Sequence, residues 1–394
     1  MTIECDVLVV GAGPAGGVAS LILAKKGLEV ILLEKNSEVG LHTKTKIDVT
    51  PQSDIEPIIK KYNLKHNGIG NKFTWYSPNG EKFTMESEIG EYYFKRGSEP
   101  DSFERQTVEL ALNSGCKLRK NSKIKDIKLK DGSYNTYIDN KETIKSKFLI
   151  ASDGNSSIVA NKFLNETRGK ELVAYGISSY DFDIEHGNTQ IYFDSNKLPG
   201  GYVYLVKDIK GLSSAGVVLD PLKISETPKE IFNKFKEKNK EIKECLKGKI
   251  ISEFGGNGCI GGLKKIGLGN LLFIGDAGRL ASPLFGYGMK PAILSSYIAA
   301  DAIIDAVNNN TDKIKNYDLF CKEKLKMELS SKMRECWDKL NNNDLVVLFK
   351  IFDKVYESKG HIGVIEKIKI ANIMRKTGKY NELKFILTSF EEMA

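Results

Sequence analysis

A glycine-rich turn between an apolar strand and a helix most constrains how this chain folds. Residues 7–10 (VLVV) predict a short strand buried on both faces. Gly11, Gly13 and Gly16 follow as G-x-G-x-x-G, and residues 18–26 continue as a helix. In such a turn the first glycine allows the tight bend, the second admits a pyrophosphate, and the third lets the helix pack close to the strand. The segment therefore predicts a dinucleotide site with phosphates at the helix N-terminus.

A second apolar strand and an acid complete this unit. Residues 29–33 (EVILL) predict a strand that ends at Glu34, which lies 18 residues after Gly16. This is close to the spacing of about 20 residues expected for an acid that accepts hydrogen bonds from ribose hydroxyls. The uncharged run over residues 7–24 is also long enough for a membrane span. Its glycines and proline argue against a continuous helix, so we reject that interpretation.

The composition is that of a globular protein. The chain has 394 residues, of which 41% are hydrophobic and 28% charged, and this length predicts two or three domains. Six cysteines are scattered without a C-x-x-C pair, which favours reduced thiols over a disulfide framework or a metal site. The N-terminal residues lead directly into the first strand, so we expect no cleavable signal and a cytoplasmic protein.

The charge balance is basic. A formal net charge of +8 fits an anionic partner such as phosphate, lipid headgroups or an acidic electron carrier. A lysine-rich solvated surface gives the same number, and both interpretations stay open. The chain has no basic run with interleaved aromatic residues, so we expect no nucleic-acid partner.

The middle of the chain alternates between strand-like and helical patterns. Residues 170–265 mostly show the alternating pattern of strands that have one exposed face. Such a pattern suits a sheet that covers a pocket. Residues 312–394 have a helical, lysine-rich pattern. Three arrangements of this region stay open: packing over the substrate side, lying on a membrane surface, or forming a solvated helical tail. The other expected elements are a hairpin over 73–94, a helix over 102–113, strands over 116–130, 133–139 and 142–148, and a helix over 228–246.

Two more strand-end motifs follow the first one. Asp153 and Gly154 come after the apolar run at residues 149–151, a place where ligands bind in open α/β sheets. The other motif has a glycine-flanked helix N-terminus, which suits an anionic group. It comprises a strand over 271–274, Gly275, Asp276, Pro283, Gly286, Gly288 and a helix over 289–307.

Together these three motifs resemble the FAD-binding signature of the p-hydroxybenzoate hydroxylase superfamily over residues 1–325. Within that superfamily, residues 275–289 (GDAGRLASPLFGYGM), residues 201–207 (GYVYLVK) and the late helical extension resemble the geranylgeranyl reductase family. This family includes digeranylgeranylglycerophospholipid reductases, which saturate the isoprenoid double bonds of archaeal membrane lipids.

The resemblance implies an α/β (α+β) fold. We expect a Rossmann-type FAD-binding domain with an inserted antiparallel-sheet substrate domain and C-terminal helices. The expected bounds are 1–165 and 266–325 for the discontinuous FAD-binding domain, with a hairpin over 70–100 contributing to the substrate sheet, 166–265 for the substrate domain, and 326–394 for the C-terminal helical region.

The resemblance also assigns cofactor-binding residues. The expected set is Gly11, Gly13, Ala15 and Gly16 at the pyrophosphate, Glu34 and Lys35 at the adenosine ribose, Arg105 at the flavin or pyrophosphate, Asp153 at its strand-end turn, Asp276 near the ribityl chain, and Pro283, Gly286, Gly288 and Met289 in the loop that faces the pyrimidine edge of the flavin.

Two departures from the family pattern concern catalysis. In the family's Tyr-x-Trp-x-Phe-Pro motif this chain keeps Tyr202 and has Tyr204 in place of the tryptophan. The family's Cys-Gly pair beside the flavin appears here as Thr45-Lys46. We therefore expect Thr45, Lys46, Tyr202 and Tyr204 to be the catalytic candidates, with Thr45, Lys46 or His42 in place of the cysteine as proton donor.

The expected chemistry is hydride transfer from reduced flavin to an alkene. An isolated alkene must be held flat against the flavin and away from water, which predicts an apolar tunnel. Its lining, unless these residues are ordinary core, is expected from Phe73, Trp75, Tyr92, Tyr93, Phe94, Tyr202 and Tyr204. A phosphate or glycerol headgroup is expected near Lys44, Lys46 or Arg96.

The leading functional hypothesis is therefore an FAD-dependent reductase that saturates the geranylgeranyl chains of archaeal-type lipid precursors. Its electron donor is expected to be external, such as ferredoxin or NAD(P)H, and peripheral contact with the inner face of the membrane is left open. One alternative is an FAD-dependent monooxygenase, of the aromatic or polyprenyl hydroxylase type, that uses NAD(P)H and oxygen. Another is a protein that binds FAD only as a scaffold or redox sensor.

Overall fold

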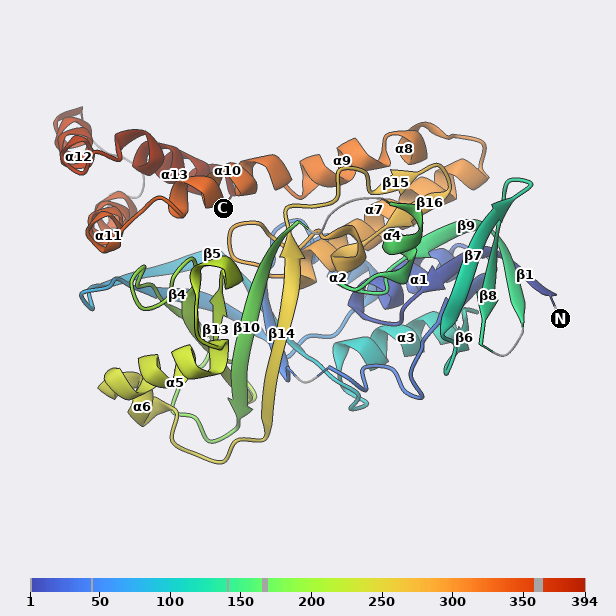
Figure 1. Cartoon of the computed structure of the whole chain (residues 1–394), viewed down its shortest axis with the longest axis horizontal. Helices are drawn as coiled ribbons and strands as arrows, with labels where there is room; N and C mark the ends of the chain where they lie inside the picture. The colour runs from blue at the N-terminus through green and yellow to red at the C-terminus, as the bar shows by residue number, and fades with distance from the viewer. Residues whose placement is uncertain (1, 44, 140–141, 165–168, 358–363, 394) are drawn as a thin grey trace. The chain divides into compact units, whose positions relative to one another are not determined.

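The computed structural model of the chain describes residues 2–43, 45–139, 142–164, 169–357 and 364–393 (Figure 1). The chain divides into two compact units, each built from separate stretches of sequence. The first unit comprises residues 1–66, 94–171 and 258–327, and the second unit comprises residues 67–93, 172–257 and 328–394. The sequence-based division set residues 326–394 apart, whereas the structure groups residues 328–394 with the second unit.

Elements are assigned to the unit that holds most of their residues. The first unit contains β1 (Thr2–Val10), α1 (Pro14–Lys25), β2 (Val30–Leu33), β3 (Ile47–Pro51), α2 (Glu56–Tyr62), α3 (Phe103–Asn113), β6 (Lys117–Arg119), β7 (Ile124–Lys130), β8 (Ser133–Ile138), β9 (Thr143–Ala151), α4 (Ile158–Phe163), β15 (Gly267–Leu268), β16 (Leu271–Phe273), the 3₁₀ turn η2 (Gly275–Gly278), α7 (Met289–Val307), α8 (Asp312–Lys315) and α9 (Tyr317–Lys324). The second unit contains β4 (Ile69–Tyr76), β5 (Lys82–Lys95), β10 (Lys170–Ser179), β11 (Asn188–Tyr192), β12 (Tyr202–Lys207), β13 (Ser213–Leu219), the 3₁₀ turn η1 (Pro221–Lys223), α5 (Pro228–Lys238), α6 (Lys240–Cys245), β14 (Ser252–Ile260), α10 (Met327–Trp337), α11 (Asn342–Glu357), α12 (Val364–Lys376) and α13 (Tyr380–Met393).

The first unit is organised around a parallel sheet. Its central strands lie in the order β6-β2-β1-β9-β16, and all four of these pairings are parallel. This order, with the first strand in the middle and later strands added on both sides, is that of a doubly wound nucleotide-binding fold. The end of β1 is fully apolar and buried, which explains why residues 7–10 lie at the centre of the sheet. The predicted α/β fold class is confirmed.

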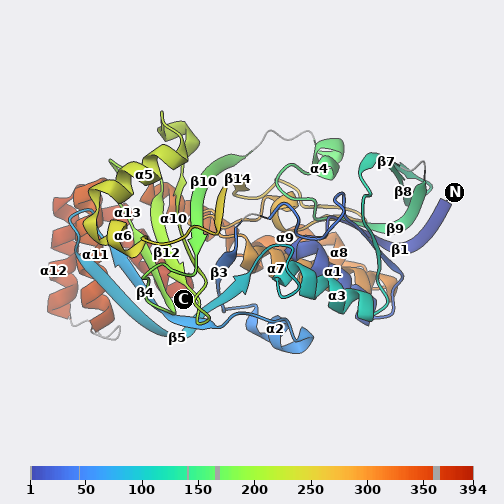
Figure 2. The same cartoon turned by 90° about the horizontal axis from the view of Figure 1, so that it is seen from below.

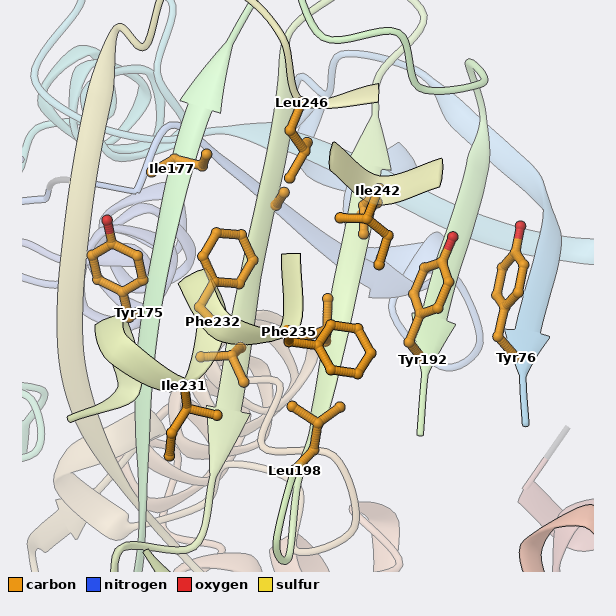
Figure 3. Packing of buried hydrophobic residues seen from close by; sticks show 14 of the residues in the cluster. Tyr76, Tyr175, Ile177, Tyr192, Leu198, Ile231, Phe232, Phe235, Ile242 and Leu246 are labelled. Carbon is orange, nitrogen blue, oxygen red and sulfur yellow. The ribbon is translucent and has the colours of Figure 1, made fainter. Parts of the chain in front are cut away.

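The second unit is organised around a mostly antiparallel sheet, whose strands from this unit lie in the order β14-β10-β13-β12-β11-β4-β5. The pair β11–β4 is parallel, while the β10–β13, β12–β13, β11–β12 and β4–β5 pairs are antiparallel. Helices α5 and α6 cover one face, where Phe232 and Phe235 point onto the strands (Figure 3). On the same face Tyr76 and Tyr192 stack with ring centroids 4.0 Å apart.

The opposite face of this sheet carries a different set of side chains. Residues paired across strands share a face, and the register pairs Ile191 with both Trp75 and Tyr204. Trp75 is buried against the C-terminal helices, with its ring 6.3 Å from that of Trp337 and 6.0 Å from that of Phe349. Figure 2 shows α10 to α13 gathered beside β4 and β5. Of the two interpretations offered for this residue, Trp75 therefore belongs to the hydrophobic core and not to the lining of a tunnel.

The structure corrects the expected elements in two places. Residues 116–130 were expected to form one strand, but this segment forms two strands, β6 and β7. The chain divides there because β6 pairs with β2, whereas β7 pairs with β8. Residues 228–246 were expected to form one helix, but the chain breaks between α5 and α6. Asn239 causes this break, since its side-chain oxygen accepts a hydrogen bond from the Ile242 backbone and begins a new helix.

Four short helices and strands, β3, α2, α4 and β15, were not expected from the sequence. Among the described residues, no helix combines the length and the apolar character needed to cross a bilayer.

Candidate active site

The three glycines of the turn between β1 and α1 have different structural roles. Two of them are required by the packing of the fold, and the third is not. Gly11 has a φ of +99°, and a Cβ there would lie 2.5 Å from the backbone oxygen of Ser152. A Cβ on Gly16 would lie 1.9 Å from the backbone oxygen of Gly11, so these two positions need glycine for close packing. A Cβ on Gly13 would meet no protein atom within 4 Å. Nothing in the fold requires glycine there, and open space above a helix N-terminus is what a pyrophosphate needs.

The end of α1 is suited to an anion. Gly13 is its N-cap residue, and no side chain caps this end of the helix. Ala15 and Gly16 follow in its first turn and are buried. Exposed N–H groups and the helix dipole together favour a negative charge at this point.

Glu34 follows β2 and reaches back to the same turn. Its carboxylate accepts hydrogen bonds from the side-chain nitrogen of Asn36 at 2.8 Å and from the backbone nitrogen of Ala12 at 3.3 Å. Lys35 is exposed, whereas Glu34 is buried. The structure therefore brings the Glu34 carboxylate to the glycine turn.

The second glycine motif meets the first at α1. A Cβ on Gly275 would lie 3.0 Å from the Cβ of Ala15, and the Ser296 hydroxyl of α7 donates to the Ala15 carbonyl at 2.8 Å. A Cβ on Gly288 would lie 3.4 Å from an Asp276 carboxylate oxygen. Gly275 and α7 thus pack against the first turn of α1, and Asp276 lies beside Gly288 at the start of α7.

The loop before α7 is a closed turn. The Gly286 nitrogen donates to the Ser282 carbonyl at 2.8 Å, and the Ser282 nitrogen donates to the Tyr287 carbonyl at 3.0 Å. Pro283 is buried inside this turn and Met289 is buried as the first residue of α7. Gly288 has no side chain that could cap α7, but the backbone nitrogen of Lys290 in the first turn of this helix donates to the Thr50 hydroxyl of β3 at 3.0 Å. The N-terminus of α7 is therefore partly satisfied by a side chain.

Asp153 takes a role that its sequence context did not reveal. Its carboxylate accepts hydrogen bonds from the Ser157 hydroxyl at 2.6 Å and from the Ile158 nitrogen at 2.7 Å. The side chain therefore caps α4, and its backbone lies beside Gly11. Burial raises the pKa of this carboxyl, and the hydrogen bonds lower it.

A buried charge cluster lies next to Asp276 and was not recognised from the sequence. The guanidinium of Arg96 pairs with Asp48 of β3 and, at 2.7 Å, with Glu104 of α3. Arg96 and Glu104 are 13% and 1% exposed, and burial raises the pKa of Asp48 while Arg96 lowers it. Burial likewise raises the pKa of Asp276, and Arg96 lowers it. The only signal in the sequence is an arginine that directly follows β5, whose end is aromatic and buried (YYFKR).

The remaining predicted residues lie in different parts of the chain. Arg105 is in the first turn of α3 and is half-buried. The Thr45 hydroxyl donates to the Ile47 carbonyl at 3.3 Å, and Lys46 forms an ion pair with Glu99 at 2.8 Å. Tyr202 and Tyr204 are half-buried on β12 of the second unit.

The headgroup residues expected from the sequence differ in what they can do. Lys44 lies outside the described residues. The guanidinium of Arg96 is paired with the carboxylates of Asp48 and Glu104, so its charge serves the structure of the cluster and not a headgroup. Of the three residues named for the headgroup, Lys46 thus stays a candidate, with its ammonium shared with Glu99.

The first unit fits FAD. The empty space at Gly13, the uncapped N-terminus of α1 and the Glu34 carboxylate lie along one edge of the parallel sheet, where ligands bind in this kind of fold. When FAD is present, Gly13 and Ala15 would hold its pyrophosphate and Glu34 its ribose. The open backbone at Gly288 would face the flavin.

Comparisons with known proteins show similarity to FAD-binding proteins. Residues 4–203 match a family model described as an FAD binding domain. The chain is 27% identical, over 93% of each chain, to digeranylgeranylglycerophospholipid reductase from Methanosarcina acetivorans. Its fold matches the crystal structure of a geranylgeranyl bacteriochlorophyll reductase-like protein from Thermoplasma acidophilum with a TM-score of 0.80, at 22% identity and over all of both chains. It also matches a probable FAD-dependent monooxygenase from Pseudomonas aeruginosa with a TM-score of 0.69, at 14% identity, over 88% of this chain and all of that one.

The family match spans just over half of the chain and includes the glycine turn, Glu34 and Asp153. The chain belongs to the FAD binding domain family, and the protein is an FAD-dependent oxidoreductase.

Proposed function

We propose that this protein reduces carbon–carbon double bonds in the geranylgeranyl chains of prenylated phospholipid precursors of archaeal-type membranes. The observation that carries this proposal is the similarity over 93% of both chains to a digeranylgeranylglycerophospholipid reductase, in a chain that matches the FAD binding domain family. The monooxygenase neighbour is more distant in both fold and sequence.

The chain's own residues have three tasks in this reaction. Bound reduced FAD supplies the hydride. The glycine turn, Glu34 and the backbone at Gly288 hold the cofactor in one orientation. The half-buried face of the second sheet, with Phe73, Ile191 and Tyr204, offers an apolar surface of the kind that a prenyl chain needs. A dry apolar surface excludes water and fixes the alkene, which is what an unactivated double bond requires.

The electron donor and the membrane contact are part of the proposal. The sequence contains one dinucleotide fingerprint, already used for FAD, so we propose an external donor such as a reduced ferredoxin; NAD(P)H is the alternative. The basic surface of the chain, with its net charge of +8, would attract an acidic carrier. Because a geranylgeranyl lipid resides in a bilayer, we propose peripheral contact with the membrane surface.

One experiment separates the reductase from a monooxygenase. The FAD-loaded protein is given a geranylgeranyl-glycerol phosphate lipid, once under argon with dithionite and once in air with NAD(P)H, and the lipid is analysed by mass spectrometry. The proposal expects a gain of hydrogen under argon. Gain of oxygen in air, with none of hydrogen under argon, would support the monooxygenase instead. Lipid unchanged in both arms, with FAD bound tightly, would favour a scaffold or sensor.

Replacing Glu34 by alanine is expected to weaken FAD binding about tenfold or more. The ribose would lose its acceptor, and Ala12 would lose the carboxylate that accepts from its backbone nitrogen. Flavin fluorescence titration of the apoprotein measures the affinity, with Lys35→Ala as the matched control because Lys35 is exposed. Retention of full flavin occupancy by Glu34→Ala after desalting would contradict this assignment.

Replacing Thr45 by cysteine is expected to preserve or raise the rate of lipid reduction. We propose that this position corresponds to the family's cysteine beside the flavin, and cysteine is close in size to threonine. Thr45→Val serves as the control of similar shape without an acidic proton. A loss of activity in Thr45→Cys with flavin still bound would argue against this correspondence.

A further inference from the structure

A pocket of the first unit lies between α2, α7 and the end of α9. It has a volume of about 250 Å³, and its lining residues all belong to this unit. The residues that α7 contributes lie more than one turn beyond Gly288. This spacing separates the pocket, which we call the α2–α7 pocket, from the residues proposed to hold the cofactor.

The inner wall of the α2–α7 pocket is apolar. Ile58 of α2 and Leu294 of α7 are only 4% and 5% exposed, and Tyr297 and Ile298 of α7 are half-buried. At about 30 Å³ for a water-sized group, the volume holds about eight such groups. This is room for a phosphate and a few carbon atoms, but not for a whole geranylgeranyl chain.

Two lysines line the pocket as well. Lys61 is in the last turn of α2, and its Nζ lies 5.7 Å from the centroid of the Tyr297 ring and 5.5 Å from that of Tyr62. Lys324 is the last residue of α9, and both lysines are exposed. Aromatic rings attract an ammonium group without neutralising its charge. Lys61 is therefore held at the pocket as a cation.

The charge balance of the pocket is positive. Its acid, Asp54, forms an ion pair with Lys290 at 2.8 Å, so these two charges offset each other. The C-terminal ends of α2 and α9 each carry about half a negative charge, which lysines in their last turns offset. Lys61 and Lys324 bring two positive charges, so about one positive charge remains. An apolar wall with a positive edge fits an anion that carries an apolar chain.

We propose that the α2–α7 pocket binds the phosphate end of an anionic lipid. The phosphate lies against Lys61 and Lys324, and the first carbon atoms of the chain pack on Ile58, Leu294 and Ile298. This inference deepens the membrane contact proposed above, and its biological purpose rests on the proposed function. An acidic electron carrier would use the lysines but not the apolar wall, which is why a lipid is the better fit.

The test titrates FAD-loaded protein with geranyl phosphate and records the isoleucine methyl groups by NMR. The resonances of Ile58 and Ile298 should shift. The resonance of Ile158, which is exposed on α4 of the same unit, should not shift. The midpoint should lie at a concentration about tenfold or more below that for geraniol or inorganic phosphate, because each of these lacks one half of the ligand.

Substitutions separate the lysines from the apolar wall. The double variant Lys61→Gln/Lys324→Gln should weaken the geranyl phosphate titration of Ile58 about tenfold or more. The matched control is Lys120→Gln/Lys123→Gln, which removes two exposed lysines of the same unit and should change nothing. Ile298→Asn should also weaken the titration. Unshifted Ile58 and Ile298 resonances, or equal affinity in the lysine variant and the wild type, would overturn the proposal.

Flotation with vesicles identifies the source of the phosphate. FAD-loaded wild type and the Lys61→Gln/Lys324→Gln variant are mixed with phosphatidylcholine vesicles that contain or lack phosphatidic acid. Wild-type flotation that requires phosphatidic acid and falls in the variant assigns the pocket to a bilayer lipid. Geranyl phosphate binding without flotation assigns it to a soluble prenyl phosphate. Flotation that falls in the lysine variant but not in Ile298→Asn would contradict the apolar half of the site and favour an acidic partner.

The pocket and the reductase can fail separately. The Lys61→Gln/Lys324→Gln variant should saturate a detergent-dispersed geranylgeranyl lipid at the wild-type rate. A wild type that shows the Ile58 and Ile298 shifts but leaves this lipid unsaturated under argon would overturn the reductase and support the pocket. A wild type that saturates the lipid without these shifts would overturn the pocket and support the reductase.

Discussion

Alanine at Gly13 is expected to abolish most FAD binding in a protein that folds normally, whereas alanine at Gly16 is expected to destabilise the fold strongly. A Cβ on Gly13 would meet no protein atom within 4 Å, and this residue has a φ of −76°, which alanine adopts without strain. The added methyl group would instead occupy the space that the pyrophosphate needs. We expect the affinity for FAD to fall about tenfold or more and the stability of the apoprotein to change by less than about 0.5 kcal/mol.

The Gly16 substitution is expected to lower the stability of the fold. Its Cβ would lie 1.9 Å from the backbone oxygen of Gly11, a clash that no side-chain rotation relieves. We expect a loss of about 3 kcal/mol or more in the free energy of unfolding, measured by denaturation of the apoprotein. Gly256→Ala is the control, because a Cβ there also meets nothing within 4 Å and the residue lies in the second unit. Equal FAD affinity in Gly13→Ala and wild type would contradict a pyrophosphate at this turn.

Replacing Arg96 by methionine is expected to destabilise the first unit by about 3–5 kcal/mol. This substitution leaves Asp48 and Glu104 facing each other without their cation, and Glu104 is only 1% exposed. Lys95→Met is the matched control from the neighbouring position. Its partner Asp101 is 63% exposed, so its loss should cost less than about 1 kcal/mol.

The pH dependence of this variant has a definite sign. Burial already raises the pKa of Asp48 and of Asp276, and Arg96 opposes this rise in both. Without Arg96 these pKa values should rise further. A carboxyl with a raised folded-state pKa stabilises the fold below its unfolded pKa, near 3.9 for aspartate, and loses this contribution as the pH rises through its folded pKa. The Arg96→Met defect should therefore be smaller near pH 4.5 than at pH 7.5. A defect of equal size at both values would exclude unpaired carboxylates as its cause.

Local sequence signals predicted the elements that we propose to hold the cofactor. The glycine turn with its flanking strands, and the helix over residues 289–307, are determined by turn glycines and apolar runs that act within a few residues. The fold class followed from the order of these elements and is confirmed. The break at Asn239 is also a local effect, yet the helical pattern on both sides concealed it.

Contacts between distant segments could not be predicted in this way. Arg96 meets Asp48 and Glu104, which come from β3 and α3, and only the folded chain brings them together. Glu91 reaches Thr189 across a glycine on the intervening strand, and this depends on a register that the sequence does not display. Asp153 was recognised as a strand-end acid, but its role as the cap of α4 depends on the backbone that follows it.

The most direct test of the account is a single turnover of the reduced flavoprotein without oxygen. Purified protein loaded with FAD is reduced with dithionite, freed of excess reductant, and mixed with a geranylgeranyl-glycerol phosphate lipid while the flavin absorbance is recorded. The account predicts that the lipid reoxidises the flavin and that one double bond is saturated per flavin oxidised. A flavin that stays reduced until air is admitted, with the lipid unchanged, would contradict it.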